Sequence, residues 1–196
     1  MSQRQATSAD EETLALYRQA QDTFDAVLDR VRPGQWDVPS ACPPWTVRDV
    51  TGHVVWGQEL VFHLAVGLPH DSRTGAPGSA NPGAAVDSQP VERWRHARST
   101  AGQRLTADTL DRPGPPRLGG RLGDFISALI VDTLAHAWDI AHPLGIDPDL
   151  PAGAITRTLP FTRTVIRAPG MFGPALTPSA DADEQTRWLA ALGRHE

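Results

Sequence analysis

Residues 124–141 read DFISALIVDTLAHAWDIA, a stretch that would be apolar on almost every side of an α-helix. A helix of that kind is expected at the centre of a helical domain, because no side of it favours water. Asp124 can cap its start, and Pro143 and Gly145 follow its end. The sequence therefore predicts one buried helix, around which the rest of the fold packs.

Further helices are expected on both sides of that stretch, where apolar residues recur at spacings of three and four. They cover about residues 8–31, 46–67, 91–105, 152–167 and 183–192. Pro160 can kink the helix that contains it. No segment alternates with period two, and the Gly- and Pro-rich segment 68–90 forms a long connection that is either mobile or a lid. We therefore expect an all-α four-helix bundle with a long crossover loop and short C-terminal helices, as one domain over residues 1–196.

The composition excludes several classes of protein. The chain has 196 residues, 40% of them hydrophobic, and a net charge of -5, which does not fit a nucleic-acid binder. The single cysteine, Cys42, rules out an internal disulfide and a CxxC motif. The first residues do not resemble a signal peptide, and no apolar run is long enough for a bilayer. We expect a soluble cytoplasmic protein with no membrane or nucleic-acid partner.

Two polar side chains interrupt the apolar stretch on one face. Asp132 and His136 lie four residues apart, one helical turn from each other, among apolar neighbours. Burying a carboxylate without a partner is costly, so this pair needs a reason. One reason is a buried Asp–His hydrogen bond that ties helices together. The other is a metal ion, to which an i, i+4 pair offers two ligands.

A third ligand would have to come from another helix. His53, in the expected helix 46–67, is the best candidate, although a single helical histidine is often an ordinary core residue. Two histidines and one aspartate would leave an open position on the ion for water or substrate. That pattern is typical of a catalytic site.

The segment before His53 carries a resemblance to a known family. Residues 36–53 read WDVPSACPPWTVRDVTGH, and residues 132–141 read DTLAHAWDIA. The two motifs together resemble the mycothiol-dependent maleylpyruvate isomerase N-terminal domain, in the DinB-like superfamily. The tail from residue 172 onward is similar to the single-domain actinobacterial branch. The resemblance implies a four-helix bundle with a divalent ion held by His53, Asp132 and His136.

This chain departs from the family pattern in two ways. The characterised isomerase type has Glu at the position of Asp132. The aspartate side chain is shorter than glutamate by one methylene. The full isomerase also carries a C-terminal domain, which this chain is expected to lack. Maleylpyruvate isomerisation itself is therefore not expected to carry over.

Other residues are also candidates for a place near the ion. Trp56 and Trp138 are expected either to line the cavity, as cofactor- or substrate-binding residues, or to pack in the core. Arg121 could meet an anionic substrate, or be an ordinary loop arginine. Asp139 could accept a hydrogen bond from a ligand or be a surface charge. Cys42, among prolines, is expected to be structural.

The favoured hypothesis is an enzyme that uses a divalent metal, zinc first and nickel second. Its catalytic group would be metal-bound water or thiolate. The resemblance implies a thiol cosubstrate such as mycothiol, transfer to or isomerisation of an electrophilic small molecule, and a possible homodimer. The alternatives are a metal-dependent hydrolase, a biosynthetic tailoring enzyme, or a non-catalytic small-molecule binding protein.

Overall fold

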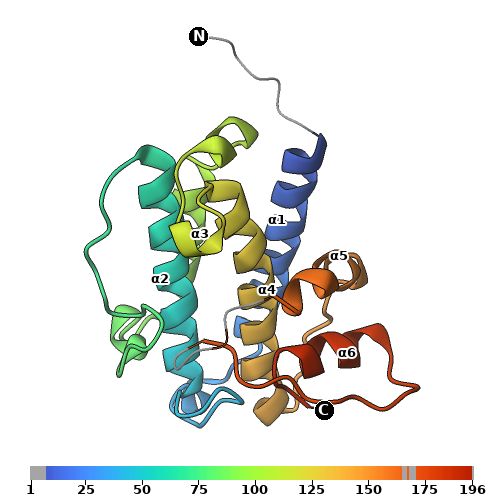
Figure 1. Ribbon diagram of the computed structural model, residues 1–196. Helices are drawn as coiled ribbons and strands as arrows, with labels where there is room; N and C mark the ends of the chain where they lie inside the picture. Colours follow the sequence, from blue (N-terminus) through green and yellow to red (C-terminus); the bar gives the residue numbers. More distant parts are fainter. Residues whose placement is uncertain (1–7, 165–166, 168–170, 196) are drawn as a thin grey trace.

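The computed structural model of the protein describes residues 8–164, 167 and 171–195, and within them it is helical (Figure 1). The two β-bridges among these residues are isolated and form no strand. The α-helices are α1 Ser8–Leu28, α2 Val47–Val66, α3 Pro90–Gly102, α4 Leu122–Ala141, α5 Ala152–Thr162 and α6 Glu184–Ala191. The predicted all-α fold is confirmed.

The four helices α1 to α4 form the bundle, and α4 lies inside it (Figure 1). Helix α4 packs against both α1 and α2, and α3 packs against α2 and, less extensively, against α1. Its apolar side chains from Leu122 to Ile140 are almost all buried, as its composition predicts. Helices α5 and α6 pack against each other, and α5 also contacts α4. They lie beside the bundle, on the side where the chain ends (Figure 1).

Several helix ends differ from the sequence-based prediction: the helices predicted over 8–31 and 91–105 end earlier, at Leu28 and Gly102, and α4 starts differently. Helix α2 begins after Thr46, whose hydroxyl and backbone N–H pair with Asp49 in a capping box. In α4 the N-cap residue is Arg121, and Asp124 accepts a hydrogen bond from its backbone N–H at 3.3 Å. Asp124 is therefore the third residue of the helix and not its cap.

Helix α5 is shorter than predicted and ends at Thr162. Pro160 lies inside it and has no N–H to donate, which weakens the last turn. The hydroxyls of Thr162 and Thr164 bond instead to the carbonyl oxygens of Leu159 and Phe161. Residues 165 and 166, which the predicted helix 152–167 included, lie outside the described residues.

The long connection between α2 and α3 lies along the outer side of α2 (Figure 1). Two glycines allow this close approach. A Cβ on Gly52 of α2 would lie 2.0 Å from the carbonyl oxygen of Pro82, and Gly75 adopts φ +92° against Trp56. Of the two interpretations of this segment, a lid packed against α2 agrees with these contacts better than a mobile loop.

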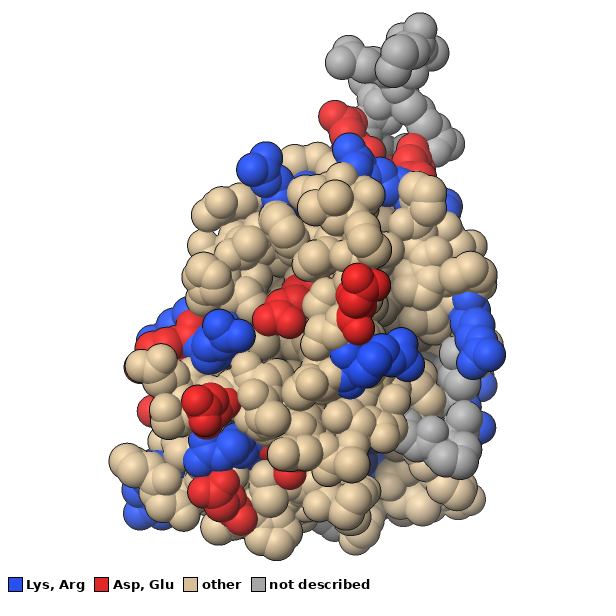
Figure 2. Space-filling view, turned by 90° about the vertical axis from the view of Figure 1, so that its left-hand side faces the viewer, with Lys and Arg blue, Asp and Glu red and all other residues tan. Residues whose placement is uncertain are grey.

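The outer surface of this side carries both signs of charge. Figure 2 shows acidic and basic side chains interspersed there, with no large area of one sign. Among the described residues, no helix is long and apolar enough to cross a membrane.

Candidate metal centre

His53, Asp132 and His136 come together where α2 meets α4. The Asp132 Oδ1 atom lies 3.6 Å from Nε2 of His53 and 3.6 Å from Nε2 of His136. Both imidazoles are buried, and the aspartate side chain keeps about a quarter of its exposure, 23%. The structure thus places the three predicted residues around one point.

The second nitrogen of His53 is held by the crossover segment, which is the connection between α2 and α3 over residues 67–89. Its Nδ1 lies 2.6 Å from the carbonyl oxygen of Gly75. A carbonyl oxygen only accepts hydrogen bonds, so Nδ1 carries the proton and Nε2 presents a lone pair when the ring is neutral. Burial disfavours the charged ring, but the adjacent Asp132 carboxylate and this carbonyl outweigh burial and raise the pKa of His53.

The second nitrogen of His136 is held by a buried ion pair. Its Nδ1 lies 2.8 Å from Oδ2 of Asp139, whose side chain is fully buried. Arg194, from the segment after α6, donates to both oxygens of that carboxylate, at 2.8 and 2.6 Å. Burial opposes ionisation of Asp139, but Arg194 and His136 outweigh it and lower its pKa. The ionised carboxylate accepts the Nδ1 proton, so Nε2 of His136 also faces Asp132 without one in the neutral ring.

The spacing of Asp132 Oδ1 and the Nε2 atoms of His53 and His136 fits ligands of one divalent ion better than direct hydrogen bonds between them. At 3.6 Å neither Asp132–His contact has the length of a hydrogen bond. Two ligands at roughly 2.1 Å from a tetrahedral ion lie about 3.4 Å apart, close to the spacing seen here. His136 and His53 lower the pKa of Asp132 to about 2 against the effect of burial, so this oxygen is an anionic donor. The alternative, a direct Asp132–His136 hydrogen bond, is not the arrangement observed.

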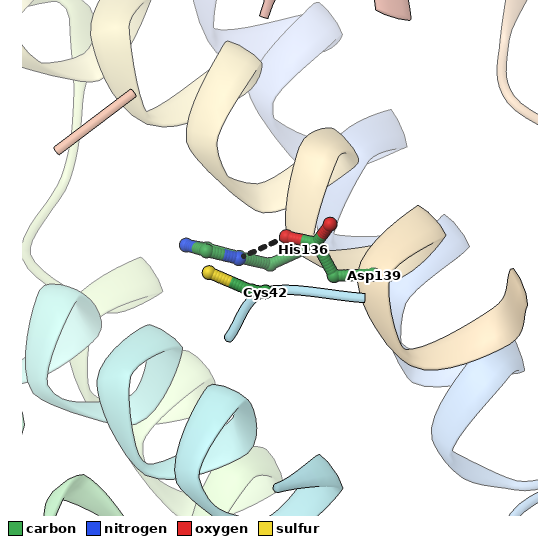
Figure 3. A group of neighbouring side chains, drawn as sticks. All are labelled: Cys42, His136 and Asp139. Atoms are coloured by element: carbon green, nitrogen blue, oxygen red, sulfur yellow. Dashed lines mark hydrogen bonds and ion pairs between the residues drawn. The ribbon is translucent and has the colours of Figure 1, made fainter. Parts of the chain in front are cut away.

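Cys42 lies beside the same imidazole, but on the side of Asp139. Figure 3 shows its thiol next to the His136 ring, while the ring's hydrogen bond goes to Asp139. Cys42, His136 and Asp139 also have the spacing of a ligand set. Asp139 is already saturated by Arg194 and His136, and burial raises the pKa of the Cys42 thiol to about 12. This second group is therefore a poor place for a cation.

A cavity of about 530 Å³ opens in front of the three residues. Its walls come from the loop before α2, the crossover segment, α4 and the region around α5, and most of them are apolar. They include Pro43, Pro44, Trp45, Trp56, Pro77, Leu118, Phe125, Ala128, Leu129, Phe161, Met171 and Phe172. Trp45 also packs against the rings of His53 and His136, at centroid distances of 5.0 and 6.1 Å.

The structure separates the three residues that were predicted to bind a cofactor or substrate, Trp56, Trp138 and Arg121. Trp56 lines it and donates from Nε1 to the carbonyl oxygen of Ser72. Trp138 is stacked on His142 at 4.4 Å and is not among the described lining residues, because it lies two positions after His136 and so on another side of the helix.

Arg121 is also absent from the described lining of the cavity. It caps α4 and pairs with Asp111 and Asp10. Asp132 lies eleven positions further along the chain, a helical rise of about 16 Å. The guanidinium that does border the cavity is Arg194. Sequence reasoning missed it, because nothing local connects residue 194 with residue 139.

The fold and the arrangement of His53, Asp132 and His136 define a class of protein: a helical bundle with a candidate His/Asp/His metal centre at an apolar cavity. Comparison with known proteins then gives the family. The family model of the mycothiol maleylpyruvate isomerase N-terminal domain matches residues 17–141, and the chain belongs to that family. The suspected resemblance is confirmed.

Similar proteins support this assignment. Two of them are uncharacterized proteins of Mycobacterium tuberculosis, MT0763 of strain CDC 1551 / Oshkosh and Rv0738 of strain H37Rv. Each is 32% identical over 169 residues, which is 86% of this chain and 86% of the relative. A crystal structure of a histidine-to-alanine mutant of mycothiol-dependent maleylpyruvate isomerase matches with a TM-score of 0.54. That match has 17% identity over 79% of this chain and 69% of the other, and it shows the fold alone.

Proposed function

We propose that this protein is a divalent-metal-dependent enzyme that joins a low-molecular-weight thiol such as mycothiol to an electrophilic small molecule, or isomerises that molecule with the thiol's help. The observation that carries the proposal is the convergence of His53, Asp132 and His136 at the inner end of an apolar cavity. Zinc is the first choice of ion and nickel the second, since two imidazoles and one carboxylate suit both.

The chain's own residues would do three things in such a reaction. Gly75 and Asp139 keep the proton of each histidine on Nδ1, so that both Nε2 atoms are donors to an ion. Trp45 and the apolar walls exclude water and hold the body of the substrate. A divalent ion, when bound, would act as a Lewis acid and favour the deprotonated form of a thiol.

Cys42 is not proposed as the nucleophile. Its thiol lines the cavity, but burial raises its pKa to about 12, far from the range of activated cysteines. The reacting sulfur in this proposal therefore comes from a cosubstrate.

Thiol dependence tests this function. The purified protein, loaded with zinc, is given an electrophilic enone with mycothiol, with another small thiol, and with no thiol. Conversion that requires both metal and thiol, and that stops on chelation, supports the proposal. Conversion without any thiol would point to the alternative, a hydrolase or tailoring enzyme. Ligand binding with no conversion under any of these conditions would point to a binding protein.

A further inference from the structure

The cavity in front of the candidate metal centre has an uneven distribution of charge. Its charged and titratable side chains are gathered at one end, where Asp132, His53, His136 and Arg194 lie. The rest of the described lining is apolar or aromatic, apart from Ser79, the Cys42 thiol and the indole N–H groups of Trp45 and Trp56. A ligand in this cavity therefore finds partners for polar groups at its inner end.

Arg194 is the one Lys or Arg side chain among the described residues that line the cavity. Its Nε and Nη2 atoms donate to the two oxygens of Asp139, and its Nη1 atom donates to the carbonyl oxygen of Leu192. Its guanidinium also lies 5.6 Å from the ring centroid of Phe172. The charge of Arg194 is thus already balanced by a buried carboxylate, so it offers a substrate no uncompensated cation.

The other arginines among the described residues do not line the cavity. Arg117 and Arg157 line a neighbouring hollow, which shares only Leu118 and Phe161 with the cavity. Arg157 is also within ion-pair distance of Glu12. A carboxylate inside the cavity, away from the metal end, would therefore be desolvated without a cation to balance it, and that is costly.

We infer that the substrate of this site carries one group that binds the metal and an otherwise neutral, largely apolar or aromatic body, and that dicarboxylates such as maleylpyruvate are excluded. The inference rests on the proposed function, because it takes the His53, Asp132 and His136 end of the cavity as the metal end. It also gives a physical reason to separate this chain's substrate from the one in its family's name.

Two thiols that differ only at their far end test the inference. Phenylmethanethiol and 4-(mercaptomethyl)benzoate share the metal-binding head, and only the second adds a carboxylate to the ring. Their affinities for the zinc-loaded protein are measured by calorimetry. We expect the neutral thiol to bind about tenfold more tightly or better, because the added carboxylate would be buried without a partner. Equal or tighter binding of the carboxylate, or no measurable binding of either thiol, would overturn the inference.

A pair of variants at one position supplies the matched control. Ala128 lines the cavity on α4 and is half-buried. Ala128→Lys places a cation there and should bring the two affinities together or reverse them. Ala128→Met adds similar length without charge and should keep the preference for the neutral thiol. If Ala128→Met erased the preference as fully as Ala128→Lys, shape and not charge would be responsible, and the inference would be wrong.

A separate signal reports on the proposed function. In the cobalt(II)-loaded protein, sulfur bound to the metal produces a charge-transfer absorption. Its absence with either thiol would contradict the proposed thiol chemistry, while the calorimetric difference between the two thiols would still decide the charge preference.

Discussion

The two sides of the candidate metal centre hold their histidines by different means. On the α2 side, His53 bonds to a neutral backbone carbonyl, that of Gly75, supplied by the crossover segment. On the α4 side, His136 bonds to Asp139, a fully buried carboxylate that Arg194 neutralises. The first arrangement depends on how closely a loop can approach a helix. The second depends on a buried charge pair between α4 and the end of the chain. The two sides should therefore fail in different ways when they are disturbed.

Removing the buried carboxylate should have the largest effect. Asp139→Ala leaves Arg194 buried without its partner, and breaking such a pair costs about 3–5 kcal/mol of the free energy of unfolding. It also releases Nδ1 of His136, and losing a hydrogen-bond partner of this kind lowers metal affinity about 10- to 100-fold. Chemical denaturation and a metal competition titration measure the two effects.

The chain supplies a matched control for that variant. Asp37 also pairs with an arginine through both carboxylate oxygens, but its side chain is 76% exposed. Asp37→Ala should change stability and metal affinity little, since water replaces the lost partner. If Asp139→Ala and Asp37→Ala had the same free energy of unfolding, the buried Asp139–Arg194 pair would not stabilise the fold as expected.

A substitution on the α2 side of the centre should lower the free energy of unfolding and the metal affinity by less than Asp139→Ala does. In Gly52→Ala, the new Cβ would lie 2.0 Å from the Pro82 carbonyl oxygen, so the crossover segment has to shift. We expect a loss of about 1–3 kcal/mol in the free energy of unfolding, as for overpacked sites. Metal affinity should fall by less than in Asp139→Ala, because the loop can shift while the backbone carbonyl still reaches His53.

Gly34→Ala is the control, because a Cβ there meets nothing within 4 Å. It should be near neutral in the same denaturation experiment. A Gly52→Ala protein as stable as Gly34→Ala would show that the crossover segment is not fastened against α2 at this point.

The smallest effect is expected at Cys42. Burial raises its thiol pKa to about 12, so at pH 8 far fewer of these groups are ionised than in an ordinary cysteine. Iodoacetamide should therefore modify Cys42 at least about tenfold more slowly in the folded protein than in denaturant. The rate should rise with pH between 8 and 10. Alkylation at pH 8 as fast as in denaturant would contradict this assignment.

Much of the fold could be predicted from the sequence, since apolar spacing and caps are local signals. The buried helix, the start of α2 at Thr46 and the all-α bundle all follow from them. The end of α5 could not be placed, because a helix that contains Pro160 can end or kink there. The three candidate ligands could be named because the spacing of Asp132 and His136 puts them on one helical face, and because the resemblance of the two motifs to the family implied His53 as the third.

The groups that orient those ligands were harder to predict. The partner of His53 is a backbone carbonyl, and a carbonyl carries no sequence signal. Asp139 was a candidate acceptor, but a buried acid and a surface acid look alike without the fold. Arg194 lies 55 residues away from Asp139, so only the packing of the segment after α6 brings the two together.

The metal content of the protein tests the central claim most directly. We expect about one equivalent of zinc or nickel in the purified protein. His136→Ala should contain none, while His142→Ala should keep a full equivalent, because His142 is exposed and stacks on Trp138 away from the cavity. No bound metal after incubation of the unchanged protein with zinc, or full occupancy in His136→Ala, would contradict the account.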